Sequence, residues 1–260
     1  MKIKKISTYR SYFIAFLDIL GFKELVKTHG FKEIRDVFSH IGIDEKNISI
    51  SMSRAVDDED DFLQNYNKAL KLCKIRIMSD SIVVAAPSRY AESLAVVLDV
   101  CNNIQENLYE CNEPVFLRGA VAEGEVYFSE EVMFGQGLID AYLAQENISV
   151  YPRIIVSEEV LAKGIAGVDE FGAYGYGGLS VDGDGYHYIN TMGNWLLLAN
   201  CGISIRNTDK YIKLKRYIEK TLSGYPDNRV REKYLWLQAE LERTADSSEK
   251  ARVLYERSVQ

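Results

Sequence analysis

Two apolar segments, each of which presents an aspartate at a turn of the chain, constrain the fold more than any other feature. Residues 13–22 have the pattern of a buried strand that carries Asp18 near its end, and a glycine then lets the chain turn into a polar helix. Residues 74–84 contain two apolar strand runs joined by a tight turn at 79–81, which places Asp80 at a hairpin tip. If strand and hairpin lie side by side, the two carboxylates converge in a geometry suited to hard divalent cations and phosphoryl transfer.

Composition predicts one main soluble domain. The 260 residues are 47% hydrophobic, enough for a substantial core, and no apolar run approaches the roughly 20 residues of a membrane-spanning helix. A net charge of −7 gives no duplex-binding surface, so neither nucleic acid nor membrane is an expected partner, and a phosphate ligand would need metal ions to offset the charge. The four cysteines form no CxxC pair and no secretory signal is recognisable, which predicts a cytoplasmic protein.

Hydrophobic spacing predicts alternating helices and strands beyond the first strand. Residues 23–39 have a helical spacing broken at Gly30, which predicts two short helices or one kinked helix. An amphipathic helix at 89–110 follows the hairpin, and then a strand pair at 115–128 with Gly124 as a turn or bulge. The remaining predictions are a helix at 136–147, a strand at 153–156, a helix at 157–163 capped by Ser157, a loop at 172–178 and a strand at 186–190.

This element order predicts an α+β domain with a split βαβ pattern on one sheet. We expect the main domain at 1–204 and a C-terminal helical extension at 205–260, in which two helices meet at Gly224-Tyr225-Pro226. The charged run at 55–61 lacks the turn glycine and spaced ligands of a calcium loop, so we interpret it as a solvated loop.

In this order, the motifs resemble those of the class III nucleotidyl cyclases. Residues 16–22 are similar to the first-strand motif of that family, 79–81 to its Gly-Asp hairpin, and 117–126 to its later paired strand. Phe134-Gly135 resembles the element before its catalytic helix, and 154–160 the following strand and helix start. The match is collinear over residues 13–163. It implies a cyclase-like βαββαβ domain of the ferredoxin or palm type with a C-terminal helical appendage.

Within that family, the chain most resembles the bacterial uridylate and cytidylate cyclases of Pycsar anti-phage defence. The resemblance lies in residues 18–23, the hairpin, residues 118–121 and Ala141-Tyr142. It implies a lyase that converts UTP to 3′,5′-cyclic UMP and pyrophosphate at a homodimer interface, with a separate effector that senses the product. A cytidylate cyclase making cyclic CMP and a catalytically silent, nucleotide-binding dimer remain alternatives. A diguanylate cyclase fits less well, because those enzymes carry an extended acidic hairpin signature.

The resemblance implies that Asp18 and Asp80 are catalytic and, with the carbonyl of Ile19, bind two divalent ions per site, either Mn²⁺ or Mg²⁺. It also implies that backbone N–H groups at a helix N-terminus hold the β- and γ-phosphates. These groups belong to Leu20, Gly21, Phe22 and Lys23. Taken singly, a helix-capping acid at Asp18 and a turn acid at Asp80 are equally good interpretations; together and in order, they favour the metal site.

Arg76 stands at the position similar to the purine-reading residue of the family, where adenine-specific members carry Lys and guanine-specific members carry Glu. Its guanidinium has only donors, which match the carbonyls of uracil better than the exocyclic amine of cytosine. An exposed strand arginine without a function is an equally good interpretation. The second base-reading position falls near Val132, where an apolar side chain argues against a purine-type hydrogen bond.

The chain departs from the family on the catalytic helix. The family's Asn and Arg correspond to Ile139 and Leu143, neither of which can stabilise a charged transition state, and the late phosphate-binding lysine is replaced by residues 182–185, Asp-Gly-Asp-Gly. The candidates for the missing interactions are Asp140, Arg118, which we also expect to bind nucleotide, and Arg153.

Overall fold

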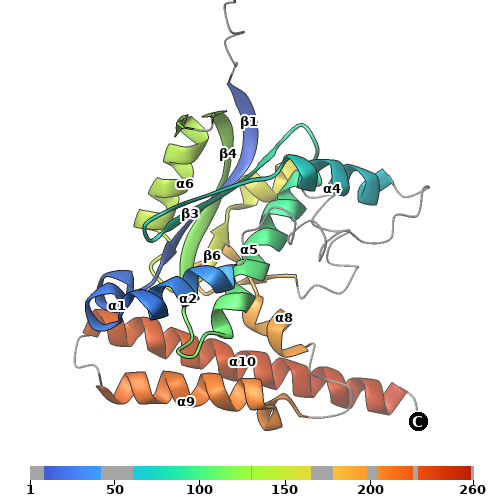
Figure 1. Ribbon diagram of the computed structural model, residues 1–260. Helices are drawn as coiled ribbons and strands as arrows, with labels where there is room; N and C mark the ends of the chain where they lie inside the picture. Colours follow the sequence, from blue (N-terminus) through green and yellow to red (C-terminus); the bar gives the residue numbers. More distant parts are fainter. Residues whose placement is uncertain are drawn as a thin grey trace, which may run out of the picture.

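The computed structural model describes residues 9–41, 61–129, 131–164, 178–197, 204–224 and 228–258. Its centre is an eight-stranded sheet of order β2-β3-β1-β4-β6-β8-β7, with β5 paired to β4 (Figure 1). The strands are β1 (Arg10–Ile19), β2 (Lys74–Met78), β3 (Ser81–Pro87), β4 (Leu117–Phe128), β5 (Met133–Phe134), β6 (Ile154–Val156), β7 (Leu179–Val181) and β8 (His187–Ile189). The helices are α1 (Phe22–Thr28), α2 (Phe31–Ile41), α4 (Asp61–Leu72), α5 (Ser93–Tyr109), α6 (Gln136–Asn147), α8 (Thr191–Leu197), the 3₁₀ helix η1 (Ile205–Asn207), α9 (Asp209–Gly224) and α10 (Asn228–Ser258).

Strand β1 organises the sheet because it pairs antiparallel with β3 on one side and with β4 on the other. Helices α1, α2 and α4 precede β2, and α5 connects β3 to β4. The resulting order β2-β3-β1-β4 is the βαββαβ arrangement of ferredoxin-like folds. The predicted α+β class and its topology are thereby confirmed.

Side-chain alternation gives the sheet two different faces. Phe13 and Leu17 lie in the larger core, with α5, which is buried over most of its length because α2 and α4 cover its outer side. Tyr12 and Ile14 lie in a second core together with Ala141 of α6. Asp18 continues this second series, so its side chain belongs to the α6 face.

Helix α6 approaches β4 backbone to backbone, and two glycines make this possible. A Cβ at Gly124 would lie 2.8 Å from the Cα of Gly137, and a Cβ at Gly137 would lie 2.9 Å from the carbonyl carbon of Gly124. The prediction of a turn or bulge at Gly124 is therefore wrong, since β4 is one continuous strand. Gly124 marks a close approach of two backbones instead.

Helices α9 and α10 lie side by side along the lower edge of Figure 1. Leu214, Leu237 and Leu241 share a core with Tyr109 and Phe116 of the main domain. The C-terminal helices therefore pack as part of the same globule. The boundary between 204 and 205 stays a prediction, and the joint at 225–227 lies outside the described residues.

Local patterns predict most elements but not all. Helices α1 and α2 separate at Gly30 as predicted, the hairpin turns at 79–80, and Ser157 Oγ accepts a hydrogen bond from the N–H of Val160 at 3.3 Å. The helix expected at 89–110 begins only at Ser93. The patterns do not predict α4, α8, β5 or β7. The charged residues 55–60 and the loop at 172–177 lie outside the described residues.

Cys73, Cys101 and Cys111 are free thiols. Burial raises the pKa of Cys73 to about 12 and that of Cys111 to about 11, so neither is a thiolate at neutral pH. Within the described ranges, every helix is too short or too polar to cross a bilayer.

We expect Gly137→Ala to destabilise the protein by about 1–3 kcal/mol, because the new methyl group forces α6 away from β4. Alanine is the better helix former, so any loss must come from this contact. Gly183→Ala is the control, since a Cβ there meets nothing within 4 Å. Urea unfolding of both variants measures the difference; a Gly137→Ala protein as stable as the unmodified one would show that α6 is not held this closely.

Candidate active site

The structure brings the two predicted metal-binding segments together. The N–H of Ile19 donates to the carbonyl of Asp80 at 2.9 Å, and Asp18 stands opposite Ser81 in the β1–β3 ladder. The hairpin turn is tight, and Ser79 adopts a φ of 57°, a left-handed conformation that usually requires glycine at this position. Asp18 and Asp80 therefore lie at the same end of two adjacent strands.

Asp18 also contacts a cation from the opposite strand. Arg118 stands opposite Asp18 in the β1–β4 ladder, and its Nε donates to Asp18 Oδ2 at 2.8 Å. Both side chains are 20% exposed, and the Arg118 guanidinium lies 3.7 Å from Glu146 at the end of α6. Arg118 thus lies beside Asp18 and is bound to it, and its role in nucleotide binding stays a prediction.

Burial raises the pKa of Asp18, although the hydrogen bond and charge of Arg118 oppose the rise. The neighbouring Asp80 carboxylate raises this pKa further. Keeping Asp18 ionised therefore costs free energy in the protein alone. A divalent cation between Asp18 and Asp80 would remove that cost.

The donor set fits a hard divalent cation that takes part of its coordination from its substrate. Among the described residues, no three His, Cys, Asp or Glu side chains form a metal-binding group, and no group donates to the Asp80 carboxylate. Mg²⁺ and Mn²⁺ are commonly held by one or two carboxylates, with water and substrate phosphates completing the shell. Asp18, Asp80 and the carbonyl of Ile19 can supply that protein share.

The predicted phosphate-binding turn is only partly available. The N–H of Leu20 already donates to the carbonyl of Phe116 at 2.9 Å, because the β1–β4 ladder continues one residue past β1. For Gly21, Phe22 and Lys23, the described part of the chain offers the backbone N–H no acceptor. Leu20 is therefore not a free donor, whereas the next three amides are.

The two predicted base-reading positions lie close together beside β2, an edge strand of the sheet. Arg76 is exposed on the α6 face of the sheet, opposite Val83, and one of its guanidinium nitrogens donates to the carbonyl of Ser129 at 3.5 Å. The N–H of Val132 donates to the hydroxyl of the same serine at 3.0 Å, and the Val132 side chain is 51% exposed. Arg76 and Val132 thus share one edge of an open surface.

Helix α6 presents apolar side chains at Ile139 and Leu143, the two positions that the sequence resemblance matched to Asn and Arg. Ile139, Tyr142 and Leu143 are between 45% and 49% exposed, and the Tyr142 ring packs edge-on against Phe16 at 5.3 Å. Asp140 accepts a hydrogen bond from Gln136 at 2.7 Å and is exposed. None of these side chains supplies a positive charge.

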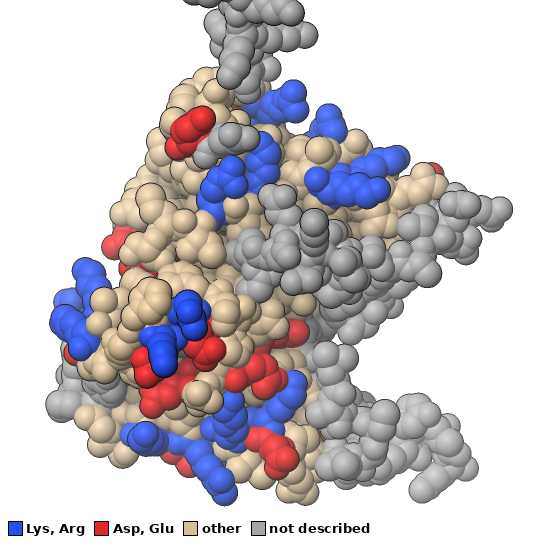
Figure 2. Space-filling view, viewed as in Figure 1, with Lys and Arg blue, Asp and Glu red and all other residues tan. Residues whose placement is uncertain are grey.

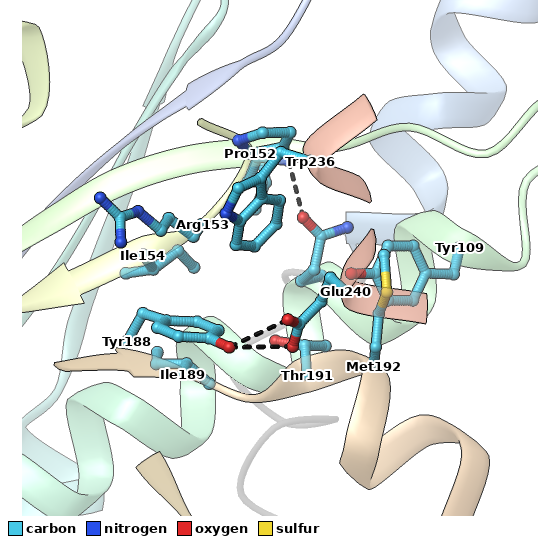
Figure 3. Close-up of a pocket in the computed structure, with 12 residues that line it drawn as sticks. Tyr109, Pro152, Arg153, Ile154, Tyr188, Ile189, Thr191, Met192, Trp236 and Glu240 are labelled. Atoms are coloured by element: carbon cyan, nitrogen blue, oxygen red, sulfur yellow. Dashed lines mark hydrogen bonds between the residues drawn. The ribbon is translucent and has the colours of Figure 1, made fainter. Parts of the chain in front are cut away.

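Arg153 is bound elsewhere. It is 3% exposed and donates to Asp182 at 2.6 Å and to Asp184, and the Nε1 of Trp236 also donates to Asp182 at 2.8 Å. Arg153 and Trp236 line a pocket of about 20 Å³. Figure 3 shows these two residues, and at the same pocket Tyr188 donates to Glu240. The structure therefore pairs Arg153 with the Asp-Gly-Asp-Gly turn and not with Asp18.

Sequence reasoning missed two groups near Asp18. Glu146 lies in the last turn of α6, beside Arg118. Lys233 comes from α10, and its ammonium interacts electrostatically with both Asp18 and Arg118. Neither belongs to a local motif, and only the docking of α6 and α10 brings them here. Among the described residues on the molecular face in Figure 2, basic side chains gather towards the top, and both signs mix below.

No protein-family model and no curated protein matches the sequence. Among solved structures, the chain is similar to the guanylyl cyclase Cya2, at 16% identity and a TM-score of 0.40 over 60% of this chain and 79% of that one. It is similar to the guanylyl cyclase domain of the RhoGC fusion protein from Blastocladiella emersonii, at 13% identity and a TM-score of 0.44 over 70% and 95%. It is also similar to the guanylate cyclase domain of RhGC from Catenaria anguillulae, solved with GTP, at 12% identity and a TM-score of 0.42 over 69% and 94%.

We expect Asp18→Asn to stabilise the metal-free protein at neutral pH. Folding raises the pKa of Asp18 above the value in the unfolded chain, which is 3.8. The folded protein therefore loses stability as the pH rises from the unfolded pKa through the folded pKa, and the loss is complete above the folded pKa. The amide carries no charge to desolvate and still accepts from Arg118. Unfolding in the presence of a chelator, from about pH 4 to 8, should show the variant's advantage growing with pH.

Asp140→Asn, at an exposed aspartate of α6, is the control and should show no such growing advantage. An Asp18→Asn protein that is less stable at pH 7 than at pH 4, relative to the unmodified protein, would contradict the electrostatics described for Asp18.

Proposed function

We propose that the chain is a metal-dependent pyrimidine nucleotide cyclase, a lyase that converts UTP to 3′,5′-cyclic UMP and pyrophosphate. One observation carries the proposal: the hydrogen bond between Ile19 and Asp80 fixes Asp18 and Asp80 at one end of adjacent strands. The collinear motifs of residues 13–163 support the same reading. CTP is the alternative substrate.

In the proposed reaction, the ribose 3′-oxygen attacks the α-phosphorus, the bond from that phosphorus to the bridging oxygen breaks, pyrophosphate leaves, and the 3′-hydroxyl proton passes to solvent. Two divalent ions would acidify the 3′-hydroxyl and neutralise the triphosphate. Asp18, Asp80 and the Ile19 carbonyl would hold them. The N–H groups of residues 21–23 would bind phosphate oxygens, and Arg118 would orient Asp18 or turn to the substrate.

We further propose that the enzyme acts as a homodimer in which each site uses both protomers. The sheet face that carries Arg76 is incompletely covered, and Met78 is 76% exposed beside it. The exposed Ile139, Tyr142 and Leu143 extend this apolar surface along α6. A second copy that covers it would bring its own Arg76 to the nucleobase bound at the first protomer's aspartates.

Arg76 supports uracil as the base, since five N–H donors suit the two carbonyls of uracil. The exposed apolar side chain of Val132 beside it offers no hydrogen bond to a purine. The product would act as a second messenger in anti-phage defence, read by a separate effector protein in the cytoplasm.

A catalytically silent, nucleotide-binding dimer is the second candidate. Its support is that Ile139 and Leu143 carry no charge and that Arg153 is held by Asp182 and Asp184. The pair of aspartates weighs against it, because a protein that only binds nucleotide has less need of two metal ions.

The first test is to incubate the purified protein with equal concentrations of ATP, GTP, CTP and UTP, with Mn²⁺ or Mg²⁺, and to identify products by mass spectrometry. We expect cyclic UMP from the unmodified protein and none from Asp80→Ala, which has lost a metal ligand. Cyclic CMP as the product would show that the substrate is CTP and would leave the rest of the proposal unchanged. No cyclic product from any nucleotide, with binding retained, would favour the silent dimer.

Mixing two inactive variants tests the shared site. We expect Arg76→Ala to lose most activity towards UTP and Asp80→Ala to lose all of it. After random re-association, half of the dimers are mixed and each has one intact site of two, so the mixture should regain about a quarter of the unmodified activity. Product formation by the mixture measures this. No regained activity, with exchange of protomers verified, would place Arg76 and Asp80 of a working site in one chain.

A further inference from the structure

Lys233 is a half-buried lysine of α10 whose ammonium lies near the Asp18–Arg118 pair. Its strongest charged neighbour is Arg118, a like charge, followed by Asp18 and Glu146. Across the described ranges, however, the ammonium makes no hydrogen bond and no close ion pair. Lys233 is thus a partly desolvated cation without a direct partner.

Such a placement costs free energy. Burial lowers the pKa of Lys233, and the adjacent Arg118 lowers it further. Two cations from different elements, β4 and α10, converge where a single aspartate is already bound to one of them. An anion beside them would recover the cost, because charge-assisted hydrogen bonds are strongest where water is partly excluded.

A cavity lies directly beside this lysine. It has a volume of 530 Å³, within the range of small-molecule sites, and lies between α1, α9, α10 and the segment before β4. Its lining includes Leu20, Gly21, Phe116, Tyr217, Lys233 and Tyr234.

The charges that line the cavity point to the Lys233 side as the place for an anion. Glu24 is bound to Lys27 at 3.1 Å, and Glu113 lies 3.6 Å from His29. Lys233 is the lining charge that, among described residues, has no such partner. Gly21 lines the same cavity and belongs to the turn that follows Asp18. An anion bound at Lys233 would thus lie beside that turn.

We propose that Lys233 is a phosphate-binding residue of the active site, supplied by the C-terminal helix α10, and that it contacts the triphosphate of the nucleotide held at Asp18 and Asp80. This inference rests on the proposed nucleotide site. Lys233 would give the site a second cation besides Arg118. Helix α6 does not provide one, and Arg153 is already bound to Asp182 and Asp184. The helical extension then completes the active site.

The test compares a triphosphate that cannot cyclise with a monophosphate. Binding of 3′-deoxy-UTP, 3′-deoxy-CTP and UMP is measured calorimetrically with Mn²⁺ for the unmodified protein, Lys233→Met, Lys233→Arg and Lys220→Met. Lys220, exposed on α9, is the matched control. We expect Lys233→Met to bind the preferred triphosphate about 10- to 100-fold more weakly and to bind UMP unchanged. Lys233→Arg should retain most of the affinity, and Lys220→Met all of it.

Thermal unfolding separates this function from a structural one. Lys233→Met removes a partly desolvated charge beside Arg118, so its unfolding temperature should stay the same or rise, whereas a lysine needed for folding would lower it. Should Lys233→Met fail to fold, Lys233→Arg and Lys233→Gln answer the same question.

The outcomes for Lys233 and for the cyclase are distinguishable. Selective loss of triphosphate binding without any cyclic product upholds the role of Lys233 and rejects the cyclase. Cyclic product with unchanged triphosphate binding in Lys233→Met upholds the cyclase and overturns the role of Lys233. Equal weakening of UMP and triphosphate, or no triphosphate binding by the unmodified protein, also overturns it.

Discussion

The pairing of β1 with β3 and β4 is the constraint on which the candidate site depends. The hydrogen bond from Ile19 to Asp80 extends the β1–β3 pairing into the hairpin turn, and the bond from Leu20 to Phe116 extends the β1–β4 pairing. Because side chains alternate along a strand, this register places Asp18 on the α6 face, opposite Arg118. A slip of one residue would move Asp18 to the face covered by α5 and separate it from Arg118. The site thus follows from how the sheet is assembled and needs no flexible loop to bring its aspartates together.

The electrostatics of the site have the imbalance typical of a binding site. Burial raises the pKa of Asp18, and burial together with Arg118 lowers that of Lys233, so both groups are held in states that the folded protein alone disfavours. A buried ion pair built for stability would place these two charges in direct contact. Here Arg118 forms the ion pair with Asp18, and the ammonium of Lys233 is available to bind another anion. Metal ions at the aspartates and phosphates at the lysine would balance both groups, which is why substrate and metal should stabilise the protein together.

Local sequence patterns predict those parts of the fold and the site that depend on interactions between residues close together in the chain. The β1 segment, the hairpin at Asp80, α6 and the break between α9 and α10 depend on hydrophobic period and turn residues. The βαββαβ order follows from their sequence. Long-range packing decides the rest: Gly124 is small because a helix crosses it, the N–H of Leu20 is occupied because a strand partner continues, and Arg153 is bound by a turn about 30 residues away. The sequence around Lys233 gives no sign that this lysine lies near Asp18, some 200 positions earlier in the chain.

The C-terminal helices are held by contacts too specific for a loosely attached appendage. Glu240 of α10 is 5% exposed and accepts a hydrogen bond from Tyr188 (Figure 3). Trp236 donates to Asp182, which is itself bound to Arg153. Arg206 donates to Glu242, and Leu237 and Leu241 join the core of Phe116. The carbonyl of Phe116 in turn accepts from Leu20, two residues after Asp18. A stretch of about two turns of α10, residues 233–241, thus carries both the buried anchors and the lysine near the site. A side chain positioned by such a helix keeps its place before any ligand arrives, which is the condition under which a single charge contributes most to binding phosphate.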